Sequence, residues 1–273
     1  MAAEVQALQR VSAVIVTYNS AAVVASCLRS LGGVREVVVV DNNSADSTIE
    51  TVRAAMPRAR IIASADNLGY GTAANIVFQQ ASGEFALLIN PDAALRPQAI
   101  ERLVAAADRY ENAAVLAPVL VDSRTQIQRS HNASLMERDS MARKRSDPVP
   151  EGDVSAGFLS GAVLLLRKCA LQSAGGFDPA IFLYYEDDDL SLRMRRAGFG
   201  LVLVADAVAE HIGGAGNGNE AVALEDSGEP EPARQGGQTA FPMPCRCRRS
   251  VAAMPTGLPR LRSVARHVQG TKT

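Results

Sequence analysis

Three short apolar runs constrain the fold of this chain more than any other feature. They span residues 11–16, 37–40 and 85–89, and within them apolar and polar residues do not alternate. Uninterrupted apolar runs of this length are typical of strands buried on both faces, as in a parallel sheet covered by helices. Segments with helical apolar spacing lie between the runs. The repeated order of strand, helix and strand therefore predicts an α/β fold with a mostly parallel, Rossmann-like central sheet flanked by helices.

Polar residues follow each of these runs at the point where the strand should end. They are Thr17 and Asn19, then Asp41 and Asn43, then Asn90 and Asp92. Asn and Asp also favour ordinary turns after strands. However, ligands of open parallel sheets bind outside the carboxyl ends of the strands. Three such clusters at one edge therefore favour a binding site over three unrelated turns.

Charge and hydropathy exclude several classes of protein. The 273 residues carry a formal net charge of −1, which gives no reason to expect a nucleic-acid partner. No apolar run approaches the roughly 18 residues of a membrane-spanning helix. Residues 1–10 lack the basic start and apolar stretch of a signal peptide. We therefore expect a cytoplasmic globular enzyme or binding protein.

The composition changes near residue 213. Residues 214–273 contain 8 Gly, 6 Pro and a single aromatic residue, Phe241, and their net charge is +3. This composition is typical of a poorly ordered segment. We therefore predict an N-terminal extension over 1–10, one domain over 11–213, and an atypical, largely disordered tail over 214–273.

Six motifs in order along residues 11–213 resemble those of the inverting family 2 glycosyltransferases. They are residues 14–19, 38–48, 67–75 and 88–93, then 175–178 together with 185–193, and finally His211. Within that family, Asn90-Pro91-Asp92 and the helix that begins at Glu186 look most like bacterial rhamnosyltransferases and related cell-surface sugar transferases. The resemblance implies a single GT-A domain. Its nucleotide-sugar half would be 11–120, and its acceptor half 121–213.

The resemblance also implies a divalent metal, Mg²⁺ or Mn²⁺, held by Asp92 and His211. A cation that bridges both phosphates of a nucleotide sugar stabilises the diphosphate as it leaves. Both metals accept oxygen ligands, and Mn²⁺ also accepts an imidazole. On its own, His211 would be interpreted as a surface or capping residue.

The strand-end residues would bind the nucleotide of the donor. A carboxylate at Asp41 can accept a hydrogen bond from the N3–H of uracil or thymine, so we expect a UDP- or dTDP-sugar. Residues 67–75 lead a glycine-rich turn into a helix, whose backbone N–H groups suit a sugar or phosphate. A plain helix-entry loop is the alternative there. The residues predicted to bind the nucleotide sugar are Thr17, Asn19, Asp41, Asn43, Asn67, Gly69 and Asn90.

Four adjacent carboxylates, residues 186–189, open a predicted helix. Acidic residues suit the first turn of a helix, and Asp189 can pair with Arg193 four residues later. Yet crowded carboxylates repel one another and can raise a pKa, and an inverting transfer needs a base for the acceptor hydroxyl. In the family, the base is the Asp of a Glu-Asp pair, which corresponds here to Asp187. The acid Asp188 stands where a typical member has an apolar residue, so the choice between the two stays open. Glu186 is grouped with them as catalytic, and Asp189, Arg193 and Gly161 as acceptor-side or supporting residues.

The resulting hypothesis is a metal-dependent, inverting sugar transferase. Rhamnose is the favoured sugar, and the acceptor would be a hydroxyl of a cell-surface polysaccharide or polyprenyl-linked glycan. A basic cluster (Arg138, Arg143, Lys144 and Arg145) could bring the enzyme to an anionic membrane surface.

Two alternatives remain open. The first is a nucleotide-sugar-binding protein with impaired catalysis. Family members usually continue past the late histidine into basic, aromatic-containing helices, whereas this chain turns Gly- and Pro-rich after Gly213. The second is a sugar-phosphate nucleotidyltransferase. That class should carry a basic, glycine-rich loop near its N-terminus, and residues 17–20 do not match one.

Overall fold

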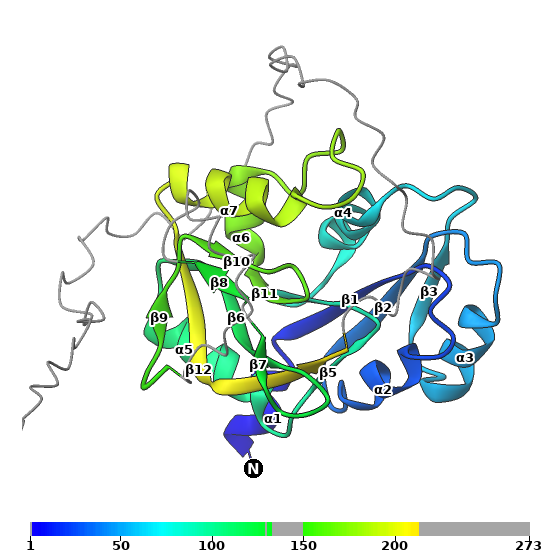
Figure 1. Cartoon of the computed structure of the whole chain (residues 1–273), viewed down its shortest axis with the longest axis horizontal. Helices are drawn as coiled ribbons and strands as arrows, with labels where there is room; N and C mark the ends of the chain where they lie inside the picture. The colour runs from blue at the N-terminus through cyan, green and yellow to red at the C-terminus, as the bar shows by residue number, and fades with distance from the viewer. Residues whose placement is uncertain (1, 129, 133–149, 213–273) are drawn as a thin grey trace, which may run out of the picture.

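The computed structural model describes residues 2–128, 130–132 and 150–212 (Figure 1). They form one curled, 10-stranded sheet with helices on both faces and a separate two-stranded ribbon. The predicted α/β architecture is confirmed. The predicted tail over 214–273 and the basic cluster at 138–145 lie outside the described residues.

The amino-terminal half supplies the parallel part of the sheet, in the order β3-β2-β1-β4. The strands are β1 (Val11–Thr17), β2 (Glu36–Asp41), β3 (Arg60–Ala63) and β4 (Phe85–Ile89). Every residue of β1 and β4 is buried, as their predominantly apolar, non-alternating sequence predicts. The direction of winding reverses between β1 and β4, and ligands of such sheets bind at that reversal.

The other half of the sheet mixes strand directions. Strand β11 (Val163–Arg167) lies antiparallel between β4 and β6 (Ala113–Val121). Strand β12 (Gly200–His211) runs parallel to β6 and antiparallel to β5 (Ala93–Leu95). Short strands extend these edges: β7 (Ile127–Gln128) pairs with β6, and β9 (Val154–Ser155) with β12. The ribbon is β8 (His131–Asn132) with β10 (Phe158–Leu159).

The helices separate into two layers, each with its own apolar core. One face of the sheet carries α1 (Ala2–Leu8), α2 (Val24–Arg29), α3 (Thr48–Ala55) and α5 (Ala99–Arg109). The other carries α4 (Tyr70–Gln80), α6 (Lys168–Ala174) and α7 (Glu186–Arg196), which lie together in Figure 1. Helix α1 lies in the predicted N-terminal extension, and its Ala7 and Leu8 pack against the first core. Within the described ranges, no helix has the length and apolar character needed to span a bilayer.

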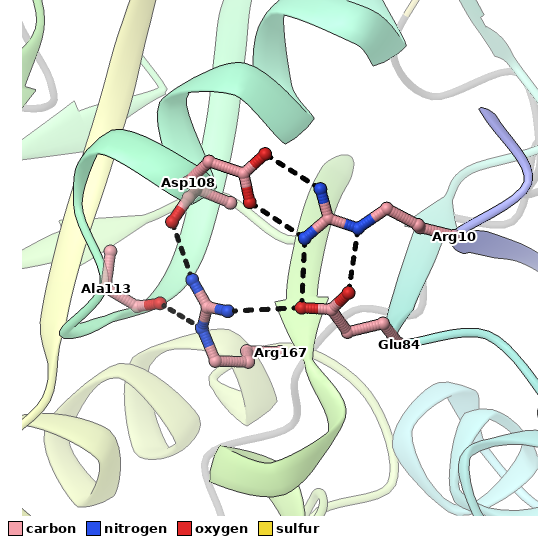
Figure 2. A network of polar contacts seen from close by, with 6 residues as sticks. Arg10, Glu84, Asp108, Ala113 and Arg167 are labelled. Carbon is pink, nitrogen blue, oxygen red and sulfur yellow. Dashed lines mark hydrogen bonds and ion pairs between the residues drawn. The ribbon is translucent and has the colours of Figure 1, made fainter. Parts of the chain in front are cut away.

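A network of charges fastens the sheet at the edge where β1 and β4 begin (Figure 2). The Arg10 guanidinium donates to both oxygens of Glu84 at 2.7 and 3.0 Å, and to both oxygens of Asp108 at 2.7 Å. Arg167 donates to the Ala107 carbonyl at 2.7 Å and lies 3.6 Å from Glu84. The network therefore joins β1, β4, β11 and α5 at the edge opposite the strand ends that carry the candidate site.

Candidate active site

The carboxyl ends of β1 and β2 meet at Thr17 and Asp41, which are paired in register. Asp41 is only 2% exposed. Its carboxylate accepts hydrogen bonds from Thr17 Oγ1 at 2.9 Å, from the Ser44 hydroxyl at 2.6 Å and from the Ser44 amide at 3.0 Å. Asp41 therefore fixes the loop after β2. Its direct contact with a nucleobase stays a prediction.

Asn19 joins the loop after β1 to the loop after β2. Its amide N–H donates to Ser44 Oγ at 2.9 Å, and its Oδ1 accepts from the Ala45 amide at 2.8 Å. The φ angles of Asn19 and Asn43 are 49° and 68°. Asn tolerates this left-handed region better than most residues. The two loops therefore form one surface at the sheet edge, and the side chain of Asn43 is exposed on it.

Asn42 was not singled out from the sequence, yet it connects β2 to the glycine-rich turn. Its buried side chain donates from Nδ2 to Asn67 Oδ1 at 2.8 Å, and its Oδ1 accepts from the Leu68 amide at 3.0 Å. The only signal in the sequence was its place between two predicted site residues. Asn42 therefore holds the turn that contains Asn67 and Gly69.

Three amides of the glycine-rich turn are hydrogen-bonded within the chain. The Leu68 and Gly69 amides donate to Asn42 and Asn67 Oδ1, and the Tyr70 amide donates to the Phe182 carbonyl at 3.1 Å. Gly69 has φ 78°, and a Cβ there would lie 2.3 Å from the Phe182 oxygen. The glycine thus permits a close approach of the chain to itself. The amides of Leu68, Gly69 and Tyr70 therefore hold the turn itself, and binding of a sugar or phosphate by the start of α4 stays a prediction.

Asp92 and His211, the predicted metal ligands, lie side by side. His211 Nε2 is 3.4 Å from Asp92 Oδ1, and Asp92 is 8% exposed. The backbone brings them together, because His211 pairs with Ala93 across β12 and β5 and the Ile212 amide donates to the Asp92 carbonyl at 3.1 Å.

Gln128 determines which nitrogen of His211 faces Asp92. The Gln128 Nε2 donates to the His211 carbonyl at 2.8 Å, which turns its Oε1 toward His211 Nδ1 at 3.1 Å. Nδ1 therefore carries the proton in the neutral ring, and the Nε2 lone pair faces Asp92. A cation or a proton between Nε2 and the carboxylate satisfies both atoms.

This pair fits a divalent cation. Mn²⁺ accepts both a carboxylate oxygen and an imidazole nitrogen, and the two candidate ligand atoms lie 3.4 Å apart. Among the described residues, no group of three or more His, Cys, Asp or Glu side chains is placed to hold a metal. The other ligand positions would therefore fall to phosphate oxygens and water, as expected from the sequence.

Asp187 is held in place by two backbone amides at the start of α7. Its Oδ2 accepts from the Gly161 N–H at 2.8 Å, and its Oδ1 accepts from the Asp188 N–H at 3.0 Å. Burial raises the pKa of Asp187, while the hydrogen bond from Gly161 lowers it. A fixed carboxylate with a raised pKa has the properties of a general base. The choice of base between Asp187 and Asp188 stays a prediction.

Glu186 is buried beside Asp187. It is 7% exposed, and its Oε2 has no hydrogen-bond partner. Burial raises the pKa of Glu186 to about 7. A buried polar atom without a partner is costly, and such groups concentrate at functional sites.

Asp189 and Arg193 form a supporting contact. The Asp189 carboxylate accepts from Arg193 Nε at 2.8 Å, and the same guanidinium donates to the Ala174 and Gly176 carbonyls at 2.9 and 2.7 Å. The pair fastens α7 to the turn that follows α6. Of the two roles considered from the sequence, these contacts favour support.

Tyr70 and Asn90 lie between the Asp92–His211 pair and helix α7, at the same edge of the sheet. Burial and the negative charges of Glu186, Asp187 and Asp92 raise the pKa of Tyr70. The Asn90 amide donates to the Ala162 carbonyl at 2.8 Å, next to Gly161. The donor-side and acceptor-side motifs therefore converge on one site.

This fold, with its site at the ends of β1, β2 and β4, is that of a GT-A glycosyltransferase. Residues 1–349 of Staphylococcus aureus TarS share it, with a TM-score of 0.57 and 19% identity, over 74% of this chain and 60% of that one. The Pyrobaculum calidifontis mannosyltransferase PcManGT, in complex with GDP-Man and Mn²⁺, has a TM-score of 0.55 and 20% identity over 74% of this chain and 56% of that one. The chain thus spans less than two thirds of the length of either solved structure.

Sequence comparison identifies the family. The model of glycosyl transferase family 2 matches residues 12–169. The N-acetylglucosaminyl-diphospho-decaprenol L-rhamnosyltransferase of Mycobacterium tuberculosis is 31% identical over 229 residues, which cover 72% of this chain and 74% of that protein. The chain therefore belongs to glycosyltransferase family 2, and the resemblance seen in its motifs is confirmed.

Proposed function

We propose that this chain is an inverting transferase that moves a sugar, rhamnose favoured, from a dTDP- or UDP-sugar to a glycan hydroxyl. The acceptor would be a polyprenyl-linked glycan or a growing cell-surface polysaccharide. The observation that carries the proposal is the convergence of the oriented Asp187 carboxylate and the Asp92–His211 pair on one sheet edge. The name of the mycobacterial relative supports rhamnose as the sugar and a lipid-linked acceptor.

In the proposed mechanism, Asp187 accepts the proton of the acceptor hydroxyl. The hydroxyl oxygen then attacks the anomeric carbon from the face opposite the diphosphate, so the configuration inverts. A divalent cation at Asp92 and His211 would supply charge neutralisation for the leaving diphosphate. Gln128 keeps His211 in the tautomer that such binding needs.

The remaining assignments follow from the same edge of the sheet. The residues that would bind the nucleotide sugar are Thr17, Asn19, Asp41, Asn43, Asn67, Gly69 and Asn90. The enzyme would work in the cytoplasm, with peripheral contact to the inner face of the membrane where a lipid-linked acceptor is held.

Transfer assays test the proposal. The purified chain is incubated with dTDP-rhamnose or UDP-sugars and a polyprenyl diphosphate-linked N-acetylglucosamine acceptor, with and without Mn²⁺. We expect transfer by the wild type with metal, a loss of at least roughly 10²-fold in Asp187→Asn, and retained activity in Asp188→Asn.

Three results would change the proposal. If no nucleotide sugar binds, the enzymatic interpretation is wrong. If donors bind but the wild type never transfers the sugar, a binding protein is the better description. Inactivation by Asp188→Asn alone would assign the base to Asp188.

A further inference from the structure

Residues 160–162, between β10 and β11, are held by backbone hydrogen bonds on both sides of Gly161. The Ser160 amide donates to the Ser130 carbonyl at 2.8 Å, and the Ala162 carbonyl accepts from the Asn90 amide at 2.8 Å. These two bonds fix the segment on either side of Gly161. The orientation of the two peptide groups that flank the Gly161 Cα therefore depends on the contacts of Gly161 itself.

Both backbone groups of Gly161 are hydrogen-bonded to side chains of opposite halves of the site. Its carbonyl accepts from the Tyr70 hydroxyl at 3.2 Å, and its N–H donates to Asp187 Oδ2 at 2.8 Å. The two groups belong to neighbouring peptide units that share the Gly161 Cα. A Cβ on Gly161 would lie 3.4 Å from the Asp187 Cβ, so the Asp187 side chain lies directly against this residue. Tyr70 thus acts on the same residue that orients Asp187.

The ring of Tyr70 is held independently of its hydroxyl. Its backbone amide donates to the Phe182 carbonyl at 3.1 Å, and its ring meets the Phe177 ring edge-on, with centroids 6.2 Å apart. Burial, together with the carboxylates around it, raises the pKa of Tyr70, which keeps the hydroxyl protonated and therefore a donor. Removing the hydroxyl alone should leave the ring and the fold in place.

We propose that Tyr70 is a positioning residue for the base: its hydroxyl holds the Gly161 carbonyl, and thereby aims the Gly161 N–H at Asp187. The inference rests on the proposed function only in taking Asp187 as the base. Tyr70 links the donor-side helix α4 to the acceptor-side helix α7 through a single glycine.

Tyr70→Phe tests this role, with Tyr110→Phe as the matched control. Tyr110 is also half-buried and donates one hydrogen bond, to Asp153 Oδ2 at 3.1 Å, but it lies outside the site. The readout is a carboxyl-carbon NMR titration of Asp187, assigned with Asp187→Asn. We expect the pKa of Asp187 to rise by roughly half a unit to one unit in Tyr70→Phe, because the charged carboxylate loses part of its hydrogen bond. The neighbouring acids, Glu186 and Asp188, are the same in both variants.

Kinetics provide a second readout. We expect kcat to fall roughly tenfold in Tyr70→Phe with the KM for the donor unchanged, since the base is displaced while donor binding is intact. An Asp187 titration identical to wild type, or the same shift in Tyr110→Phe, would overturn the proposal. Absence of transfer by the wild type would instead refute the proposed function, and the titration would still decide the role of Tyr70.

Discussion

Glu186 should make this protein less stable as the pH rises. The pKa of Glu186 is 4.5 in the unfolded chain and about 7 in the folded chain. Between these pH values, the folded chain holds a proton on Glu186 that the unfolded chain has released. Between these two pH values the folded state binds more protons, so the free energy of unfolding falls as pH increases. At 1.36 kcal/mol per unit, the total loss above pH 7 is about 3 kcal/mol.

Glu186→Gln removes this loss, because the amide has nearly the same shape and does not ionise. We expect the variant and the wild type to have similar unfolding free energies at pH 4.5. At pH 8 the variant should be more stable by about 3 kcal/mol. The same change should lower transfer activity, since stabilising replacements at functional sites commonly reduce function.

Urea unfolding at pH 4.5 and pH 8 measures the effect, with Glu50→Gln as the control. Glu50→Gln is the same chemical change at an exposed position in the first turn of α3. A stability difference for Glu186→Gln that is equal at both pH values would refute the reasoning, as would no gain at pH 8. Either result would mean that burial does not disfavour the charged form of Glu186.

Three further predictions concern contacts outside the acidic helix. Arg10→Met should lower the free energy of unfolding by about 1–2 kcal/mol at pH 7, after allowance for solvent screening. Because Arg10 lowers the pKa of Asp108, urea unfolding at several pH values should show this loss shrinking below the normal pKa of that carboxyl and vanishing below its lowered pKa in the folded chain. Gly176→Ala places a Cβ 2.1 Å from Asn75 Oδ1 and should cost roughly 2–3 kcal/mol in thermal unfolding, because Asn75 must give up its two backbone hydrogen bonds. Gln128→Ala should weaken Mn²⁺ binding at least about tenfold by calorimetry, and unchanged affinity would exclude its role in orienting the histidine.

Strands β1, β2 and β4 were predictable because each is built on a predominantly apolar run without alternation of apolar and polar residues. Strand β6 was not predicted, although all nine of its residues are buried. It contains Pro118, which normally argues against a central strand. The register of β12 shifts between Val204 and Val208, directly beyond its pairing of Val204 with Pro118. A register shift in β12 thus accompanies Pro118 of β6. The sequence alone does not reveal this shift.

The candidate site was predictable where one residue type carries the chemistry. Asp92, Asp187 and His211 follow from motif order and from the ligands that metals and proton transfers require. Gln128 and Asn42 could not be predicted in this way, because each acts through a partner that only the fold places beside it. Gln128 lies 83 positions from His211 in the chain. For the glycine-rich turn, the fold adds a role that the sequence does not show, since Gly69 lets the chain approach the distant Phe182 carbonyl.

The position of β11 in the sheet has a consequence for synthesis of the chain. β11 lies between β4 and β6, yet it is made after both. At roughly 5–20 residues per second, a ribosome leaves the facing edges of β4 and β6 without their partner for seconds. Unpaired apolar strand edges invite pairing with other chains. Aggregation of the nascent protein should therefore depend on how fast residues 122–167 are translated, and pausing within that interval should lower the yield more than pausing after it.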